Sequence, residues 1–260
     1  MPERKIVVIE PEGPREWYQP LEVFGEVEFF SPAGTIGPEL VRELARGSEA
    51  VIITSSCGFS AEDMDDLPTL RIIAKCGGKP SSVDVEAATG RGIAVTYVPG
   101  ANSSTVAEFT VMLILDCLRR FPFISTSIGE GLDRNTTDMF GRELRGKTVG
   151  LIGFGAVGKE VTRRLAGFDC RVEVHDPFYE PDGSEPPCLT FRGSLDEVLP
   201  GADVLSLHCT LSGSTKGMIG DRELRMMKPS AGIINTARAQ LVDERALEAA
   251  LREKRLAFAA

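Results

Sequence analysis

The sequence predicts an α/β protein made of two doubly wound parallel-sheet domains. Short apolar runs alternate with helix-like segments in two series, and Pro99-Gly100 separates the series. In the second series a glycine-rich turn, residues 153–158, joins a predicted strand to a predicted helix. Strands that are apolar along their whole length and alternate with helices indicate parallel sheets covered on both faces. We therefore expect one domain over residues 1–99 and a second over residues 100–260.

An unusually apolar helix follows the Pro99-Gly100 break. Residues 103–121 predict one long helix that Ser103 or Ser104 can cap, and such a helix is either domain core or subunit interface. The polar stretch 129–144 predicts a loop. In the first series, residues 1–99, the apolar runs that predict strands are 6–9, 27–30, 51–54, 71–74 and 93–98. Helices are predicted at 39–47, 61–67 and 84–92.

The second series stops inside a predicted strand. Its strands are expected at 148–155, 171–176, 203–209, 231–237 and 255–260, with helices at 157–168, 194–199, 221–228 and 243–254. The last six residues, RLAFAA, resemble the first half of a buried strand, with no turn or helix after them. Each large apolar side chain left uncovered forfeits roughly 1.5–3 kcal/mol. We therefore expect the chain to be a fragment of a longer protein.

Composition excludes several classes of protein. The net charge of -9 argues against nucleic acid and anionic membranes as main partners, since both require clustered Lys and Arg. The 6 cysteines lack metal or disulfide spacing, which predicts reduced thiols, a cytoplasmic location and no metal site. Apolar runs such as 111–115 are too short to span a bilayer, and the N-terminus has no signal-peptide pattern.

The glycine turn predicts a dinucleotide site. Gly153 allows a tight turn, Gly155 lets the backbone approach a pyrophosphate, and Gly158 lets the helix pack against the strand. The helix N-terminus then offers N–H groups and a partial positive charge to the phosphates. Asp176 ends the next predicted strand, where an acid accepts hydrogen bonds from the adenosine ribose and favours NAD over NADP. Asp176 could instead be a turn residue before Pro177.

Several separate motifs then resemble the NAD-dependent D-2-hydroxyacid dehydrogenases, and D-3-phosphoglycerate dehydrogenases in particular. They are VDVEAATGRGIAVTYVPGANSSTVAE, GRELRGKTVGLIGFGAVGKEV, HDP, LHCTLSGSTKGMI and MKPSAGIINTARAQLVDERAL. The resemblance implies a flavodoxin-like substrate domain beside a Rossmann NAD domain, which would be incomplete here. It also implies hydride transfer between NAD and the C2 atom of a small 2-hydroxy or 2-oxo acid, and a homodimer formed through the helix 103–121.

The resemblance assigns roles to particular residues. Arg238 matches the arginine that holds the substrate carboxylate and polarises the carbonyl group. The cofactor site would comprise Gly153, Gly155, Ala156, Val157, Gly158 and Asp176, together with His208, Cys209, Thr210, Thr236 and Ala237. Ala156 stands where the family usually has Arg or another polar residue, so one phosphate contact is lost.

Two departures from the family concern the substrate. The segment KCGGKPSS has Lys75 in place of an arginine, and Lys75, Gly77, Gly78 and Lys79 are the expected substrate ligands. This segment could also be a plain strand–helix connection. His175 and His208 are the only histidines, and neither matches the family's acid/base position, which together with its Glu would fall beyond Ala260.

Three functions therefore stay open at this point. The first is an NAD-dependent dehydrogenase of phosphoglycerate-like or hydroxypyruvate-like acids. The second is an NAD-binding dimeric module without catalysis, similar to the C-terminal-binding corepressors or to a decayed enzyme. The third is another hydride-transfer enzyme on the same fold, such as a formate or phosphite dehydrogenase.

Overall fold

A computed structural model describes residues 4–11, 13–32, 36–54, 57–131, 140–183 and 185–260. The chain divides into two compact units, Met1–Ala101 (unit 1) and Asn102–Ala260 (unit 2), and each is described by itself. Both units contain a parallel sheet with helices, which confirms the predicted α/β class. The functional names given to the two domains stay predictions. None of the helices among the described residues is long and apolar enough to cross a membrane.

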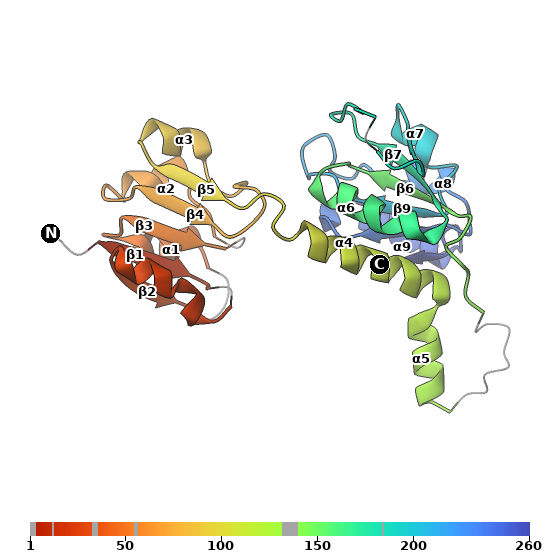
Figure 1. The fold of residues 1–260 in the computed structure, drawn as a ribbon, viewed down its shortest axis with the longest axis horizontal. Coiled ribbons are helices and arrows are strands. Elements are labelled where there is room, and N and C mark those ends of the chain that lie inside the picture. Colours follow the sequence, from red (N-terminus) through yellow and green to blue (C-terminus); the bar gives the residue numbers. More distant parts are fainter. Residues whose placement is uncertain (1–3, 12, 33–35, 55–56, 132–139, 184) are drawn as a thin grey trace. The chain divides into compact units, whose positions relative to one another are not determined.

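Unit 1 is built on a five-stranded sheet in the order β2-β1-β3-β4-β5 (Figure 1). The order reverses between β1 and β3, and open α/β sheets bind ligands beside the carboxyl ends of the strands at such a point. The elements are β1 (Lys5–Ile9), η1 (Arg15–Val23), β2 (Glu26–Phe30), α1 (Pro38–Ala45), β3 (Ala50–Ile53), α2 (Ala61–Asp65), β4 (Ile72–Lys75), α3 (Val85–Gly90) and β5 (Ala94–Tyr97).

The core of unit 1 lies between the sheet and helices α1 to α3. Val51, Ile53 and Ile73 of the strands pack in one cluster with Val41 of α1 and Ala88 of α3. The 3-10 helix η1 buries none of its own residues. Its Tyr18 ring meets Phe29 of β2 edge-on, with centroids 5.5 Å apart. Since Phe30, next to Phe29, faces the main cluster, η1 lies on the opposite face of the sheet.

Unit 2 holds a six-stranded parallel sheet in the order β11-β10-β9-β6-β7-β8. Its first helices are α4 (Ser103–Arg119) and α5 (Phe121–Gly129). The strands are β6 (Thr148–Ile152), β7 (Arg171–His175), β8 (Leu189–Phe191), β9 (Val204–Leu207), β10 (Gly232–Asn235) and β11 (Phe258–Ala259). The remaining helices are α6 (Ala156–Leu165), η3 (Ala166–Phe168), α7 (Leu195–Val198), α8 (Asp221–Met226), η4 (Ala239–Leu241) and α9 (Glu244–Arg252).

Alternate residues of the strands in unit 2 enter two different cores. Leu151 and Val204 pack with α4 and α6, whereas Ile152 and Leu205 pack with α7, α8 and α9. Neighbouring residues in a strand point to opposite faces, so helices cover both faces of this sheet. This is the doubly wound arrangement that continuously apolar strands predict.

The long predicted helix 103–121 is confirmed as α4, which ends at Arg119. Arg120 has a φ of 55°, so α4 ends there and α5 begins at Phe121 with Pro122 in its first turn. The polar loop expected at 129–144 is a turn up to residue 131, and residues 132–139 lie outside the described part. The expected strand 255–260 is a strand only at Phe258–Ala259. The elements η1, α5 and β8 are not predicted from the sequence.

Candidate cofactor site

The glycine turn of unit 2 has the geometry that a pyrophosphate requires. Gly153 has a φ of 97°, and a Cβ there would lie 2.7 Å from the Cys209 nitrogen, so only glycine fits. A Cβ on Gly158 would lie 2.4 Å from the Gly153 oxygen. A Cβ on Gly155 would meet no atom within 4 Å. Of the three glycines, Gly155 is thus the one at which the backbone is open to a ligand. No side chain caps α6, which leaves the first N–H groups of this helix for a phosphate.

Asp176 follows β7, and its carboxylate is hydrogen-bonded to the glycine turn. One carboxylate oxygen accepts a hydrogen bond from the Phe154 nitrogen at 2.7 Å, and the other accepts from the Phe178 nitrogen at 2.9 Å. A carboxylate has about four acceptor positions, so acceptors remain for ribose hydroxyl groups. The turn-forming role and the ribose-binding role considered for Asp176 are therefore compatible, and the structure displays the first of them directly.

An aromatic cluster that no sequence pattern predicted supports this end of the site. Phe154 meets Tyr179 and Phe191 edge-on, and the Tyr179 and Phe191 rings stack with centroids 5.2 Å apart. The ammonium group of Lys159 lies 4.6 Å from the Tyr179 centroid. A hydrogen bond to Glu185 raises the pKa of Tyr179 to about 12. These contacts fix Phe154, whose nitrogen donates to Asp176, and Tyr179, which follows Asp176 in the chain.

The segment after β9 lies beside the glycine turn. The backbone nitrogen of His208 donates a hydrogen bond to the Ile152 carbonyl at 2.7 Å. The His208 ring pairs with the Ser206 hydroxyl, Nε2 to Oγ 2.9 Å, and burial lowers the pKa of His208 to about 4. Burial also raises the pKa of the Cys209 thiol. Both side chains are therefore uncharged near pH 7, and Thr210 follows them at the surface.

Arg238 stands on a turn that a single asparagine closes. The Asn235 side chain accepts a hydrogen bond from the Ala237 nitrogen at 3.1 Å and donates one to the Arg238 carbonyl at 2.9 Å. The guanidinium of Arg238 is exposed and donates to the Ala237 carbonyl. The Thr236 hydroxyl lies 2.9 Å from the hydroxyl of Thr110 in α4. Asn235 and Thr110 were not among the predicted site residues, although Asn235 belongs to the same INTAR motif.

The predicted substrate segment lies in unit 1, at the end of β4. Lys75 is 5% exposed, and its ammonium donates to the carbonyls of Thr54 and Cys57 and to the hydroxyl of Ser82, at 2.9, 3.3 and 2.5 Å. An ammonium has three N–H groups, and all three have partners here. Burial lowers the pKa of Lys75. Lys75 as a substrate ligand stays a prediction, since in this structure its ammonium supports the surrounding loops.

The neighbours of Lys75 are more accessible. Lys79 is exposed, whereas Gly77 and Gly78 are partly buried. The Gly77 carbonyl accepts a hydrogen bond from the Val98 nitrogen at 3.0 Å, which fixes the start of this segment against the end of β5. A Cβ on Gly77 or Gly78 would meet no atom within 4 Å. The backbone at these two glycines is therefore approachable, as a substrate site requires.

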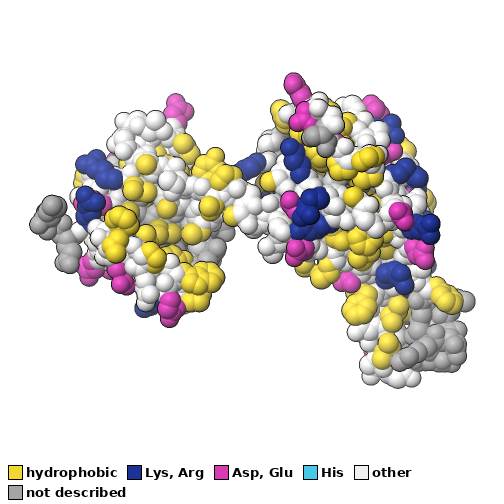
Figure 2. All heavy atoms as spheres, in the orientation of Figure 1, with side chains coloured by type: hydrophobic (Ala, Val, Ile, Leu, Met, Phe, Trp, Pro, Cys, Tyr) yellow, Lys and Arg dark blue, Asp and Glu magenta, His cyan; other side chains and the backbone are white. Residues whose placement is uncertain are grey.

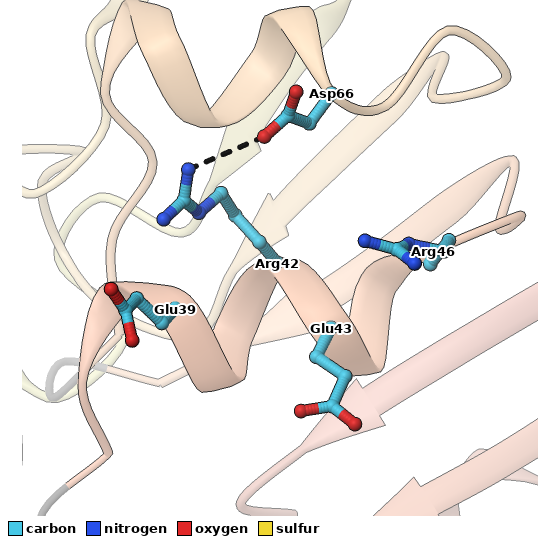
Figure 3. Close-up of a pocket in the computed structure, with 5 residues that line it drawn as sticks. All are labelled: Glu39, Arg42, Glu43, Arg46 and Asp66. Carbon is cyan, nitrogen blue, oxygen red and sulfur yellow. Dashed lines mark hydrogen bonds and ion pairs between the residues drawn. The ribbon is translucent and has the colours of Figure 1, made fainter.

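Unit 1 also has a hollow on its surface, away from the segment of Lys75, that is lined by charged side chains. It is a surface groove that α1 and Asp66 line with charges of both signs (Figure 3). Arg42 in this groove pairs with Asp63 at 3.1 Å and with Asp66 at 3.3 Å. The charge of Arg42 is thus matched by two neighbouring carboxylates. Among the described residues, no group of His, Cys, Asp and Glu is arranged to hold a metal ion.

Comparison with known proteins agrees with this geometry. Residues 111–260 match the family described as D-isomer specific 2-hydroxyacid dehydrogenase, NAD binding domain. A glyoxylate reductase of Thermococcus gammatolerans is 36% identical over 234 residues, which cover 88% of this chain and 70% of that protein. A D-3-phosphoglycerate dehydrogenase of Methanocaldococcus jannaschii is 32% identical over 240 residues, and the match spans 92% of this chain but 45% of the archaeal protein.

Solved structures give the same result. A protein from Thermus thermophilus superposes with a TM-score of 0.87 at 33% identity, covering 98% of this chain and 80% of that one. A glyoxylate reductase from Paecilomyes thermophila superposes with a TM-score of 0.85 at 30% identity, covering 100% and 81%. The sequence resemblance, the expected fold and the expected cofactor are confirmed. The chain belongs to the D-isomer specific 2-hydroxyacid dehydrogenase family, and residues 111–260 match the NAD-binding domain of that family.

Proposed function

We propose that this chain is an NAD-dependent oxidoreductase acting on a small 2-hydroxy or 2-oxo acid, of the phosphoglycerate, hydroxypyruvate or glyoxylate kind. The observation that carries the proposal is the Asp176 carboxylate, bonded to the Phe154 nitrogen between Gly153 and Gly155. This bond holds the carboxylate that we assign to the adenosine ribose against the glycine turn, which supports a dinucleotide site within one unit. Relatives named glyoxylate reductase and D-3-phosphoglycerate dehydrogenase support the substrate class.

The residues of the site have separable tasks in such a reaction. Asp176 orients the adenosine ribose, and the α6 N-terminus faces the pyrophosphate. Thr236 and Ala237 line the nicotinamide ribose. Arg238 binds the substrate carboxylate and withdraws charge from the C2 oxygen, and its planar guanidinium suits a carboxylate better than an ammonium would. A cofactor held by these residues would supply the hydride as NADH or accept it as NAD+, and reduction of the 2-oxo acid would also consume one proton.

Direct binding and turnover measurements test the proposal. NADH and NADPH are titrated by the change in their fluorescence, and NADH is expected to bind at least about 10-fold more tightly because Asp176 repels a 2′-phosphate. NADH oxidation is then followed with hydroxypyruvate, 3-phosphohydroxypyruvate and glyoxylate. Arg238→Lys should keep the NADH affinity and lower kcat/KM at least about 100-fold. A chain that binds neither nucleotide would contradict the proposal.

A second function is an NAD-binding module without catalysis. Its support is that both histidines are engaged elsewhere: His208 with Ser206, and His175 Nδ1 with the Arg192 carbonyl at 3.2 Å. A proton donor for the C2 oxygen would then have to be another group. NADH binding without oxidation by any of the three acids would favour this function. Turnover that Arg238→Lys abolishes would eliminate it.

A second copy of the chain is the partner we propose. On α4, Val111 and Ile114 face the core, whereas Phe109 is 51% exposed and Met112 is 44% exposed. Figure 2 shows hydrophobic side chains along this edge of unit 2 and on α5, where Phe121 is also exposed. Exposed apolar surface of this kind is typical of an interface, which supports a subunit contact through α4. The free cysteines fit the expected cytoplasmic location.

A further inference from the structure

Helix α4 reaches the cofactor site through one side chain. Thr110 is fully buried on the face of α4 that packs against the sheet, and its hydroxyl lies 2.9 Å from that of Thr236. The two residues are 126 positions apart in the sequence. Thr236 precedes Ala237 and Arg238 in the turn that Asn235 closes. Thr110 is therefore a contact between the turn that carries Arg238 and another element of unit 2.

The direction of this hydrogen bond follows from the donors available. A threonine hydroxyl has one hydrogen and two acceptor positions. The Thr110 hydroxyl donates its hydrogen to the Val106 carbonyl at 2.8 Å, within α4. It must then accept from Thr236, whose own hydrogen is directed toward α4. The Thr236 hydroxyl is left with acceptor positions only, and these match the hydroxyl donors of a ribose.

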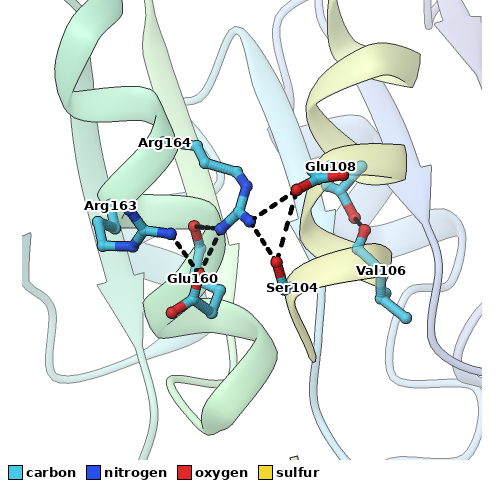
Figure 4. Close-up of polar contacts among 7 residues, drawn as sticks. Ser104, Val106, Glu108, Glu160, Arg163 and Arg164 are labelled. Atoms are coloured by element: carbon cyan, nitrogen blue, oxygen red, sulfur yellow. Dashed lines mark hydrogen bonds and ion pairs between the residues drawn. The ribbon is translucent and has the colours of Figure 1, made fainter. Parts of the chain in front are cut away.

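Helix α4 is a firm support for this contact. Arg164 of α6 donates to Ser104 at 2.6 Å and to Glu108 at 3.0 Å, and it also pairs with Glu160 of its own helix (Figure 4). The buried face of α4 contributes Ala107 and Ile114 to the core that α6 shares. The loss of one hydroxyl on α4 should therefore leave the helix in place and release only Thr236.

We propose that Thr110 is a positioning residue for the nicotinamide end of the site. Its hydroxyl fixes the rotamer of Thr236 and, with Asn235, the backbone that presents Ala237 and Arg238 to the nicotinamide ribose and the substrate. The inference rests on the proposed function, because it needs NAD to lie across this turn. It adds a residue on α4 that acts through Thr236 and does not itself touch the cofactor.

The test compares two nucleotides on matched variants of the whole chain. NADH reaches the Thr236 turn, whereas ADP ends at the pyrophosphate and does not. Thr110→Val removes the hydroxyl at nearly constant volume, and Thr110→Ser restores it. Thr162→Val is the control, because Thr162 on α6 is equally buried and its hydroxyl has no hydrogen-bond partner among the described residues. Dissociation constants are measured by NADH fluorescence and by displacement with ADP.

Thr110→Val should raise the dissociation constant of NADH about 3- to 10-fold, as expected for the loss of one hydrogen bond, and should change that of ADP less than about twofold. Thr110→Ser should recover the wild-type NADH affinity, and Thr162→Val should match wild type with both nucleotides. The double variant Thr110→Val, Thr236→Val should bind NADH no more weakly than Thr236→Val alone, because both changes break one bond.

Three outcomes would overturn the inference: wild-type NADH affinity in Thr110→Val, equal weakening of NADH and ADP, or a serine variant as impaired as the valine variant. Thr110→Ala keeps the inference testable if Thr110→Val does not fold, since it removes the same hydroxyl from α4 and should show the same selective loss of NADH affinity. A wild-type chain that binds neither ADP nor NADH would instead contradict the proposed function and remove the inference with it.

Discussion

Lowering the pH from 7 to 4 should destabilise unit 2 through His208. Burial lowers the pKa of this histidine from 6.5 to about 4. Below pH 6.5 the unfolded chain takes up a proton that the folded chain refuses until about pH 4, so stability falls as the pH falls through this window. The pKa difference corresponds to at most about 3 kcal/mol. Typical domains have only about 5–15 kcal/mol of stability, so this loss is large enough to measure.

His208→Gln isolates the effect. Glutamine can still reach the Ser206 hydroxyl but cannot titrate, and the carboxylates that titrate in acid are shared by both proteins. The stability advantage of wild type over His208→Gln should shrink by up to about 3 kcal/mol between pH 7 and pH 4. His175→Gln, the same change at the other histidine, shows how much of the effect is specific to position 208.

Urea unfolding at several pH values measures this difference. Circular dichroism follows both units, and fluorescence of the single tryptophan, Trp17 in unit 1, separates the transition of that unit. The imidazole resonances give an independent reading, because the chain has 2 histidines. Parallel stability curves for wild type and His208→Gln, or a His208 resonance that titrates near pH 6.5, would refute the reasoning.

Three further predictions concern other parts of the chain. Gly158→Ala should destabilise unit 2 by about 2 kcal/mol or more in urea unfolding, because its Cβ meets backbone, whereas Gly155→Ala should fold normally and lose NADH affinity in a fluorescence titration. Lys75→Met should destabilise unit 1 by about 1–3 kcal/mol, since buried carbonyl groups lose their donor, and unchanged Trp17 unfolding would contradict this. Phe109→Asp should convert a dimer to a monomer in light scattering without lowering NADH affinity; a wild-type monomer at all concentrations would exclude the dimer.

Regular elements were predictable because their signals are local. The continuous apolar runs around Val149 and Val204 indicated the strands of unit 2, and the glycine turn indicated the boundary between β6 and α6. Helix α5 was missed, although Pro122 in its first turn favours the start of a helix. The 3-10 helix η1 was missed because it buries no residue and so has no apolar periodicity.

The polar contacts of the site were predictable only in part. The INTAR motif identifies Arg238, but the sequence does not show that Asn235 closes the turn beneath it. The Thr110–Thr236 contact joins residues that only the folded sheet brings together. Lys75 is the clearest case: the carbonyls of Thr54 and Cys57, from the segment after β3, converge on its ammonium with the hydroxyl of Ser82, and KCGGKPSS itself contains only the last of these three acceptors.

The carboxylate of Asp176 also bears on how cofactor preference can change over evolution. In the proposed site, replacing this acid with an apolar residue would remove the repulsion of a 2′-phosphate, but it would also deprive the Phe154 and Phe178 nitrogens of their acceptor. A single substitution would thus loosen the pyrophosphate turn at the same moment as it admits the new cofactor. A change of preference toward NADP would therefore require both a replacement acceptor for the Phe154 nitrogen and a cation for the 2′-phosphate. The same carboxylate thus links cofactor preference to the stability of the turn.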